Sequence, residues 1–548
     1  MDQNDQFQQP VQRSPRTSRR EFLVGAGAAG LVAAGAAVAP SDVAGTRPPA
    51  TSPPHGERAL PAPQVRLISA TAKPTSADWA ALARRLSTRK LLRPGEKGYR
   101  QAKQLFEPRF DGLQPAGVAY CASAADVAAC LSFVRRFRLP VRVRSGGHSY
   151  AGWSSVTGGL VVDVSAIHLI ATGNSTIRVG SGTDLIHFYS ELSARGLAVP
   201  GGSCPTVGIA GLALGGGVGV LSRLYGLTCD NMTAVQIVTA DGSVLECDQK
   251  RNSDLYWACR GGGGGNFGVA TSFTFAAHHL TELCVFYLSW PWSRAAQVIG
   301  AWQSWAPHAP DALWSTLHLS ADFGGKPVLS VSGTYAGAQS DLAAHLDDLS
   351  GRVSAKPSLT SVSRQSYLDA MLLEAGCPTI PLRSCHTGPG GQLSRVPAFA
   401  KSDLFTKPLS RRGIRALLSG IEKVSAIRGA DNGGGSIAFD ALGGAVNRVH
   451  PAATAFVHRD ALFLAQYYTS WNWPGTRRGV ANQHRWLRSY YNSMHPHASG
   501  QAYQNYIDPG LSDWQHAYYG ANYARLTRVK AKYDPGNMFS FPQSIGSA

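Results

Sequence analysis

Arg144-Ser145-Gly146-Gly147-His148-Ser149-Tyr150 begins a glycine-rich region, residues 144–231, from which the fold can be predicted. Three more segments continue it: Gly202-Ser203-Cys204-Pro205-Thr206-Val207-Gly208, Gly215-Gly216-Gly217 and Tyr225-Gly226-Leu227-Thr228-Cys229-Asp230-Asn231. Glycine permits the close approach and the strained dihedral angles of tight turns, and clustered backbone N–H groups bind anions without a charged side chain. The stretch therefore predicts turns that hold a large anionic cofactor, one turn carrying a histidine and one a cysteine.

Length, composition and charge limit the number of domains and the classes of partner. The chain has 548 residues, which favours two domains over one, and its hydrophobic content of 44% is sufficient for a sizeable core. The formal net charge of +18 is compatible with a nucleic-acid partner, but the basic residues are spread along the chain. No helix-turn-helix, zinc-finger or RNA-binding signature accompanies them. We therefore expect a generally basic surface, suited to acidic substrates or an anionic envelope, and no nucleic-acid partner.

Nine cysteines lie singly along the chain. None forms a Cys-x-x-Cys pair, which argues against a structural metal site. The odd number indicates at least one thiol outside any internal disulfide. Cys377 and Cys385 either close a small loop or remain two reduced, half-buried thiols, and the sequence leaves both possibilities open.

The N-terminal segment carries Arg19-Arg20, then Glu21, Phe22 and Leu23, and it continues without charge to Ala39. The run from Phe22 to Ala39 has 18 residues, which is short for a membrane-spanning helix, and it contains four glycines. The twin arginine and the weakly apolar run favour a Tat export signal over a retained anchor. We expect a signal peptide over 1–39 and a linker over 40–77. The mature protein is then extracytoplasmic or secreted through the Tat machinery, with no stable membrane span.

Beyond residue 78, short strands alternate with helices, which predicts an α+β fold and not a doubly wound sheet. Ser123, with Asp126 three residues later, is typical of a helix N-terminus, and apolar residues at helical spacing continue towards Pro140. A second helix is expected over 184–197 and a hairpin through Asp241-Gly242. Strands are expected over 141–144, 160–164, 177–179, 235–238 and 244–245, and later over 285–288, 329–331 and 463–469.

Four blocks of sequence, in this order, resemble the berberine-bridge-enzyme-like branch of the vanillyl-alcohol-oxidase superfamily of FAD-linked oxidases. They read RSGGHSYAGWSS, GGSCPTVGIAGLALGGGVG, DLYWACRGGGGGNFGVAT and YYGANYARLTRVKAKYDPGNMFSFPQSI, within a resemblance that covers residues 85 to 545. The resemblance implies a two-part PCMH-type FAD-binding domain, formed by residues 78–280 and by a C-terminal segment over 500–548 that returns to it. It also implies a substrate domain over 281–499, with an antiparallel sheet covered by helices.

The resemblance further implies FAD attached at two points, from His148 to the flavin 8-methyl carbon and from Cys204 to flavin C6. Taken alone, a histidine in such a turn and a single cysteine are more typical of structural residues. A neutral imidazole and a thiolate are competent nucleophiles, so positive surroundings and backbone N–H groups are expected near Cys204. Other residues expected at the cofactor are Arg144, Ser145, Gly146, Gly147 and Ser149 around the pyrophosphate, and Thr206, Val207, Gly208, Gly211, Gly268, Val269 and Asn505.

Tyr506 matches the tyrosine that is proposed as the catalytic base in the family. Because the reference pKa of a phenol is near ~10, it acts near neutrality only if its phenolate is stabilised. Gln466 and Tyr468 are expected to face the substrate, from the period-two alternation of their strand. Some relatives carry a glutamate near Ala465 and many a tyrosine at Val218. Their absence here predicts that the acidic base is missing and that the pocket is less polar.

Val207 is small, as in family members whose flavin is accessible to oxygen. The resemblance therefore implies an oxidase that transfers hydride from a small-molecule substrate to flavin N5 and makes hydrogen peroxide from molecular oxygen. The expected substrate is an alcohol, a sugar lactol or a secondary metabolite. Two alternatives stay open: a dehydrogenase with a quinone or protein acceptor, and a non-catalytic flavin-containing protein that binds carbohydrate or envelope components.

Overall fold

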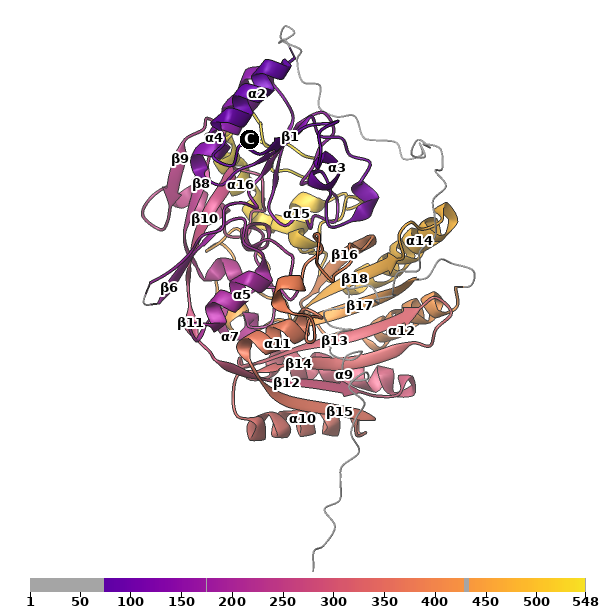
Figure 1. Cartoon of the computed structure of the whole chain (residues 1–548). Coiled ribbons are helices and arrows are strands. Elements are labelled where there is room, and N and C mark those ends of the chain that lie inside the picture. Colours follow the sequence, from indigo (N-terminus) through magenta and orange to yellow (C-terminus); the bar gives the residue numbers. More distant parts are fainter. Residues whose placement is uncertain (1–72, 174, 428–432, 548) are drawn as a thin grey trace, which may run out of the picture.

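The computed structural model describes residues 73–173, 175–427 and 433–547 (Figure 1). The expected Tat signal over 1–39 and nearly all of the expected linker lie outside these residues. Among the helices that the structure describes, none is both long and apolar enough to cross a membrane. Sheets of four, five and seven strands carry the fold and helices flank them, so the predicted α+β class is confirmed.

The first sheet has the strand order β1 (Leu91–Leu92), β2 (Gly117–Tyr120), β4 (Leu160–Asp163) and β3 (Val141–Arg144), of which the last three are parallel. Helices α2 (Ser76–Arg85) and α4 (Ala124–Phe137) pack on it through an apolar cluster. Helix α4 begins as predicted, because Ser123 Oγ accepts the Asp126 N–H at 3.2 Å. The capping box is incomplete, because the Asp126 carboxylate accepts the N–H groups of Ser87 and Ala122.

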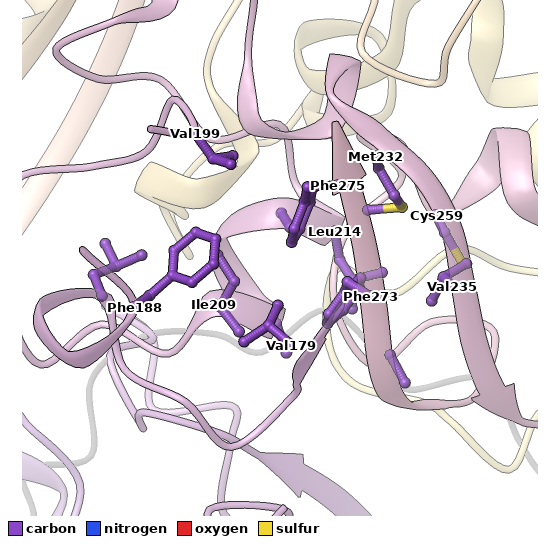
Figure 2. Packing of buried hydrophobic residues seen from close by; sticks show 14 of the residues in the cluster. Val179, Phe188, Val199, Ile209, Leu214, Met232, Val235, Cys259, Phe273 and Phe275 are labelled. Carbon is purple, nitrogen blue, oxygen red and sulfur yellow. The ribbon is translucent and has the colours of Figure 1, made fainter. Parts of the chain in front are cut away.

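The second sheet is antiparallel, in the order β5 (Ile170–Thr172), β6 (Thr176–Gly180), β10 (Val269–Ala276), β8 (Met232–Val238) and β9 (Val244–Cys247). β8 and β9 form the predicted hairpin, in which Gly242 has a φ of 87°. Figure 2 shows the core that joins this sheet to α5 (Leu185–Ser193) and α6 (Ile209–Leu214). Helix α5 is shorter than predicted, because Gly196 turns the chain with a φ of 65° and β7 (Leu197–Ala198) follows.

The third sheet is antiparallel and has the order β15 (Leu359–Ser366), β12 (Glu282–Ser289), β14 (Val328–Tyr335), β13 (Leu313–Asp322), β17 (Gly433–Ala441), β18 (Phe463–Trp471) and β16 (Ala398–Phe405). The strands predicted at 285–288, 329–331 and 463–469 lie within β12, β14 and β18. Four helices cover one face through a shared apolar core (Figure 1): α9 (Ala295–Trp305), α10 (Gln339–Val353), α12 (Arg411–Ser425) and α14 (Arg477–Met494). The opposite face borders a large cavity.

The C-terminal segment, with α15 (Trp514–Tyr519) and α16 (Tyr523–Tyr533), packs back onto the first half of the chain. The buried Lys530 Nζ donates to the Asn266 carbonyl and to the Asp534 carboxylate, each at 2.7 Å. Asn266 Oδ1 in turn accepts the Ile545 N–H at 2.9 Å. These contacts fix the glycine-rich loop that precedes β10.

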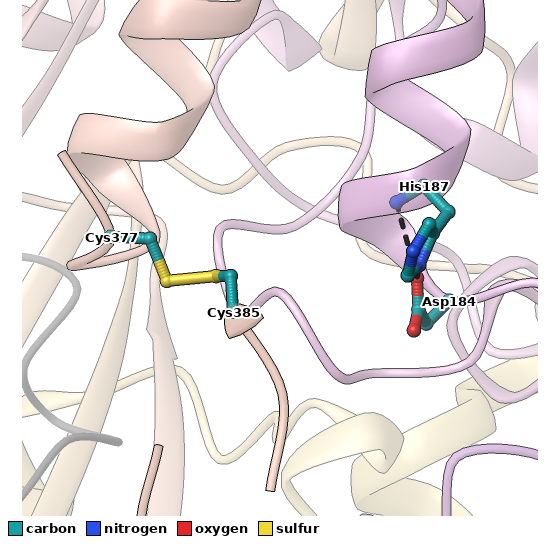
Figure 3. The surroundings of a disulfide bond; sticks show 4 residues. All are labelled: Asp184, His187, Cys377 and Cys385. Atoms are coloured by element: carbon teal, nitrogen blue, oxygen red, sulfur yellow. Dashed lines mark hydrogen bonds and ion pairs between the residues drawn. A yellow bond between two sulfur atoms is a disulfide. The ribbon is translucent and has the colours of Figure 1, made fainter. Parts of the chain in front are cut away.

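Cys377 and Cys385 form a disulfide after helix α11 (Tyr367–Glu374), which decides between the two possibilities that the sequence left open (Figure 3). Both cysteines belong to a small buried apolar cluster that includes Ile186 of α5. The other seven cysteines are free.

Replacing both Cys377 and Cys385 with serine is expected to lower the free energy of unfolding by about 2–3 kcal/mol, because a cross-link over a short loop restricts the unfolded chain. Thermal unfolding of the wild type and the double variant, both without reductant, measures the change. An unchanged unfolding midpoint would show that the cross-link does not stabilise the protein.

Candidate active site

A large cavity lies where loops of the first two sheets meet the open face of the third sheet. The space between its walls is about 2310 Å³, part of which is open to solvent. The predicted site residues that line it are Ser145, Gly146, Gly147, His148, Ser149, Cys204, Val207, Gly208, Gly211, Gly268, Gln466, Tyr468, Asn505 and Tyr506. Arg144, Thr206 and Val269 do not line it.

The turn after β3 and the turn before α6 touch, which brings His148 and Cys204 to the same cavity. A Cβ at Gly146 would lie 2.4 Å from the Gly208 nitrogen, so a side chain there would collide with backbone. A Cβ at Gly208 would lie 2.0 Å from Ser145 Oγ, which itself donates to the Ser181 carbonyl at 2.7 Å. Glycine at both positions is therefore a condition for assembling the site.

The three remaining predicted residues lie outside the lining of the cavity and contact other parts of the chain. Arg144 is buried, and its guanidinium donates to Asp163 at 2.5 Å and to the Ala102 carbonyl at 2.6 Å. Because this charge is already paired with a buried carboxylate, the Arg144 side chain holds β3 to β4, and a contact of Arg144 with the pyrophosphate stays a prediction. Val269 is buried where β10 pairs with β8. Thr206 contacts His148.

The imidazole of His148 faces the cavity between Phe106 and Thr206. Its ring stacks on Phe106 with centroids 4.0 Å apart, and its Nε2 lies 2.8 Å from Thr206 Oγ1. Burial lowers the pKa of His148 to about 3, so the ring is neutral. In the tautomer whose Nε2–H donates to Thr206, Nδ1 keeps its lone pair and is the nucleophilic nitrogen of a neutral imidazole.

Cys204 lines the same cavity, in surroundings that differ from those predicted. Burial raises the pKa of Cys204 to about 11, although contacts with Thr206 and the backbone N–H of Val207 act in the opposite direction. The predicted N–H groups are therefore present, but burial outweighs them. The thiol is therefore protonated near neutrality, and any reaction through its sulfur requires the loss of that proton.

Three strands of the third sheet present polar side chains to the cavity. These are Trp314 and Thr316 of β13, Asp440 of β17, and Gln466 and Tyr468 of β18. Gln466 Nε2 donates to Tyr150 Oη at 2.9 Å, which connects the sheet to the histidine turn. The same alternation turns Ala465 towards the helix-covered core, so a side chain at 465 does not reach the cavity. This wall of the pocket carries polar side chains, while Val218 contributes an apolar side chain to the lining of the same cavity.

Asp440 is the residue that the sequence prediction missed. It lies opposite Leu464 of β18 and in register with Thr316 of β13, so the neighbouring strand supplies the carboxyl group that position 465 lacks. Burial raises the pKa of Asp440 to about 7, and a hydrogen bond with Thr316 offsets only part of this effect. The available signal is an acid inside the apolar run Ile437–Leu442. Asp440 is half-ionised near neutrality, as suits a general base.

Tyr506 lines the cavity near Asp440, on the segment that returns to the first half of the chain. Burial and the Asp440 carboxylate raise the pKa of Tyr506 well above the usual value for tyrosine. The surroundings therefore favour the neutral phenol and not the phenolate that a tyrosine base requires. Asn505 is held beside it, because its Nδ2 donates to the Leu212 carbonyl at 3.1 Å.

Comparisons with known proteins identify the family of the chain. A family model described as "FAD binding domain" matches residues 115–248, and one described as "Berberine and berberine like" matches 502–546. The "Uncharacterized FAD-linked oxidoreductase YvdP" of Bacillus subtilis (strain 168) is 33% identical over 464 residues, which cover 84% of this chain and 98% of the relative. The chain belongs to the berberine-bridge-enzyme-like family of FAD-linked oxidoreductases.

Solved structures of FAD-linked oxidoreductases share the fold. The wild-type BBE-like 1 of Physcomitrella patens has a TM-score of 0.76 and 30% identity, over 84% of this chain and 97% of the other. The xylooligosaccharide oxidase from Myceliophthora thermophila C1, solved in complex with xylobiose, has a TM-score of 0.75 and 26% identity, over 86% and 100%. The family resemblance predicted from the four sequence blocks is confirmed.

The cavity of this FAD-linked oxidoreductase fits FAD. A Cβ at Gly211 would meet no atom within 4 Å, so the absence of a side chain there leaves space in the cavity wall. Two buried polar atoms on the lining, Ser154 Oγ and Gln543 Oε1, have no hydrogen-bond partner among the described residues. Polar groups of a bound nucleotide would satisfy them. When bound, FAD supplies the two-electron acceptor, while the polar strand residues remain free to contact a substrate.

Proposed function

We propose that this protein is a Tat-exported oxidase whose FAD is bonded to His148 and Cys204. It oxidises a hydroxyl-bearing carbon of a small molecule, with molecular oxygen as the final acceptor and hydrogen peroxide as product. The observation that supports this most is the convergence in one cavity of two nucleophilic side chains with the carboxyl group of Asp440. Export follows from Arg19-Arg20 and the apolar run after it.

Asp440 takes the hydroxyl proton in this proposal. Oxidation of an alcohol carbon removes a hydride and a proton, and a base with a pKa near the working pH assists the proton loss. The Thr316 hydroxyl orients Asp440 from the adjacent strand. Tyr506, as a neutral phenol, donates a hydrogen bond to the substrate oxygen and orients it. The predicted role of Tyr506 as base thus passes to Asp440.

The substrate that fits this wall carries several hydroxyl groups, as a sugar lactol does. Trp314 Nε1 is buried without a partner among the described residues, and it lines the cavity with Thr316 and Gln466. An apolar substrate would leave such groups unpaired, at about 1–3 kcal/mol each, whereas hydroxyl groups pair with them. Two similar proteins are named for such substrates, the xylooligosaccharide oxidase and the "Chitooligosaccharide oxidase" of Gibberella zeae, the latter 29% identical over 449 residues.

Val207 lines the cavity and, in this proposal, leaves room for oxygen. Replacing it with isoleucine is expected to slow reoxidation by air about tenfold or more, because a barrier higher by about 1.4 kcal/mol is tenfold in rate. The rate of reduction by substrate should stay within about twofold of wild type. Stopped-flow mixing of the reduced enzyme with oxygen measures the effect. Equal reoxidation rates in both proteins would remove Val207 from this role.

Anaerobic mixing with aldoses and simple alcohols, followed by air, tests the function as a whole. We expect the flavin absorbance to bleach with one or more sugars and to return in air with one peroxide per turnover. Bleaching that persists in air would indicate the dehydrogenase. A fully loaded flavin that no sugar or alcohol reduces would contradict the proposed substrate class.

A further inference from the structure

Two neighbouring helices on the outer side of the third sheet carry an unusual concentration of positive charge. Their exposed basic residues are Arg411, Arg412, Arg415 and Lys423 of α12, and Arg477, Arg478, Arg485 and Arg488 of α14. Helix α14 contains no acidic residue in its 18 positions, and α12 contains only Glu422. We call these eight side chains the basic face.

The helical repeat gathers these residues on one side of each helix. At 3.6 residues per turn, the four arginines of α14 fall within about 100° of its circumference, and the four basic residues of α12 within about 120°. The opposite sides carry the apolar residues, such as Leu417 and Trp486, which pack on the sheet. The charges therefore point outward together.

The two stripes form one surface, because the helices are in direct contact (Figure 1). A Cβ at Gly420 of α12 would lie 1.9 Å from the ring of Tyr490 of α14, so only glycine permits this approach. Trp486 Nε1 also donates to the Gly420 carbonyl at 2.9 Å, and Tyr490 Oη to the Leu417 carbonyl at 2.9 Å. These contacts hold the two helices, and with them the two halves of the basic face, in a fixed arrangement.

The charges of the basic face are not neutralised within the described part of the chain. None of its eight residues forms an ion pair there, whereas other exposed arginines do: Arg178 with Glu246, Arg195 with Glu191, Arg352 with Asp348 and Arg364 with Glu282. Moreover, Arg411-Arg412 and Arg477-Arg478 are the first two residues of their helices, where the helix dipole disfavours cations. Both features oppose stability, which points to an external anionic partner.

We propose that the basic face binds a linear acidic polysaccharide, which holds the enzyme on a carboxylate-bearing carbohydrate surface. Seven of the eight residues are arginine, whose planar guanidinium binds carboxylate in two-point geometry. The aromatic residues of α14, Trp486, Tyr490 and Tyr491, are buried against the sheet and offer no rings to stack with bases. The apolar sides of both helices are likewise used in the core, so none remains to enter a lipid layer.

Fluorescence anisotropy of the full-length holoenzyme with labelled oligogalacturonate tests this proposal. A variant with R477Q, R478Q, R485Q and R488Q should bind about tenfold more weakly at low salt, because four exposed charge contacts of about 0.2–1 kcal/mol each are lost. Binding by the wild type should weaken strongly as salt is raised. Turnover of a small soluble substrate should be the same as wild type in this variant and in its control.

The matched control replaces four paired arginines, R178Q, R195Q, R352Q and R364Q, and so removes the same net charge from other places. We expect its affinity to stay within about twofold of wild type. Equal weakening in both variants would overturn the proposal, because net charge alone would then explain binding. Binding to single-stranded oligonucleotides or phosphatidylglycerol vesicles without binding to oligogalacturonate would also overturn it. Unfolding midpoints of both variants confirm that they fold.

Discussion

The Asp440→Asn variant is expected to reduce its flavin with substrate about 10²–10³-fold more slowly than wild type, because it lacks the base that takes the hydroxyl proton. Burial raises the pKa of Asp440 to about 7, so the wild-type rate should rise with pH through about 7 and then level off. The variant should lose this rise. Anaerobic stopped-flow measurements from pH 5 to 9 record both effects.

Asp322→Asn is the matched control, since Asp322 ends strand β13 of the same sheet and is exposed. Its reduction rate should equal that of wild type. The thermal stability of Asp440→Asn distinguishes a folding defect from the loss of the base. Because burial raises the folded-state pKa of Asp440 from 3.8 to about 7, the free energy of unfolding falls as the pH rises between these two values, and the loss is complete above about 7. Asp440→Asn should therefore unfold at an equal or higher temperature than wild type at pH 8. An unchanged reduction rate would exclude Asp440 as the base.

The second large effect concerns the two proposed attachment points. In His148→Ala and in Cys204→Ala, one bond remains, so we expect flavin still to precipitate with the protein in acid. In the double variant, all flavin should move to the supernatant. Absorbance of the redissolved pellet and of the supernatant measures the distribution.

Cys229→Ala is a suitable control, because Cys229 is also a buried thiol in a predicted glycine-rich segment and does not line the cavity. It should retain flavin as wild type does. If His148→Ala alone releases all flavin, Cys204 forms no bond. If the double variant keeps acid-stable flavin, the attachment lies elsewhere.

The sequence was sufficient for the parts of the site that depend on local backbone. Glycine at 146 and 208 is needed wherever two turns cross this closely, so the turns and the two nucleophiles in them could be predicted. The alternation of β18 likewise predicted that Gln466 and Tyr468 face the same way. Family resemblance added the expected cofactor, which no spacing in the chain specifies.

The sequence was insufficient where function depends on which strands are neighbours. Asp440 and Ala465 lie on adjacent strands, opposite Leu464 and Phe439. The sequence of either segment alone does not predict that the two strands are neighbours in the sheet. Arg144 shows the same limit, because the ion-pair partner of its side chain, Asp163, lies on the neighbouring strand β4. β17 itself escaped prediction, since its three leading glycines are more typical of a loop.

Peptide mass analysis of acid-precipitated wild-type protein tests whether FAD is bonded to both His148 and Cys204. We expect one FAD per chain, with the flavin mass found on a cross-linked pair of peptides that contain His148 and Cys204. Flavin recovered entirely in the supernatant, or on peptides that contain neither residue, would show that neither side chain is bonded to FAD.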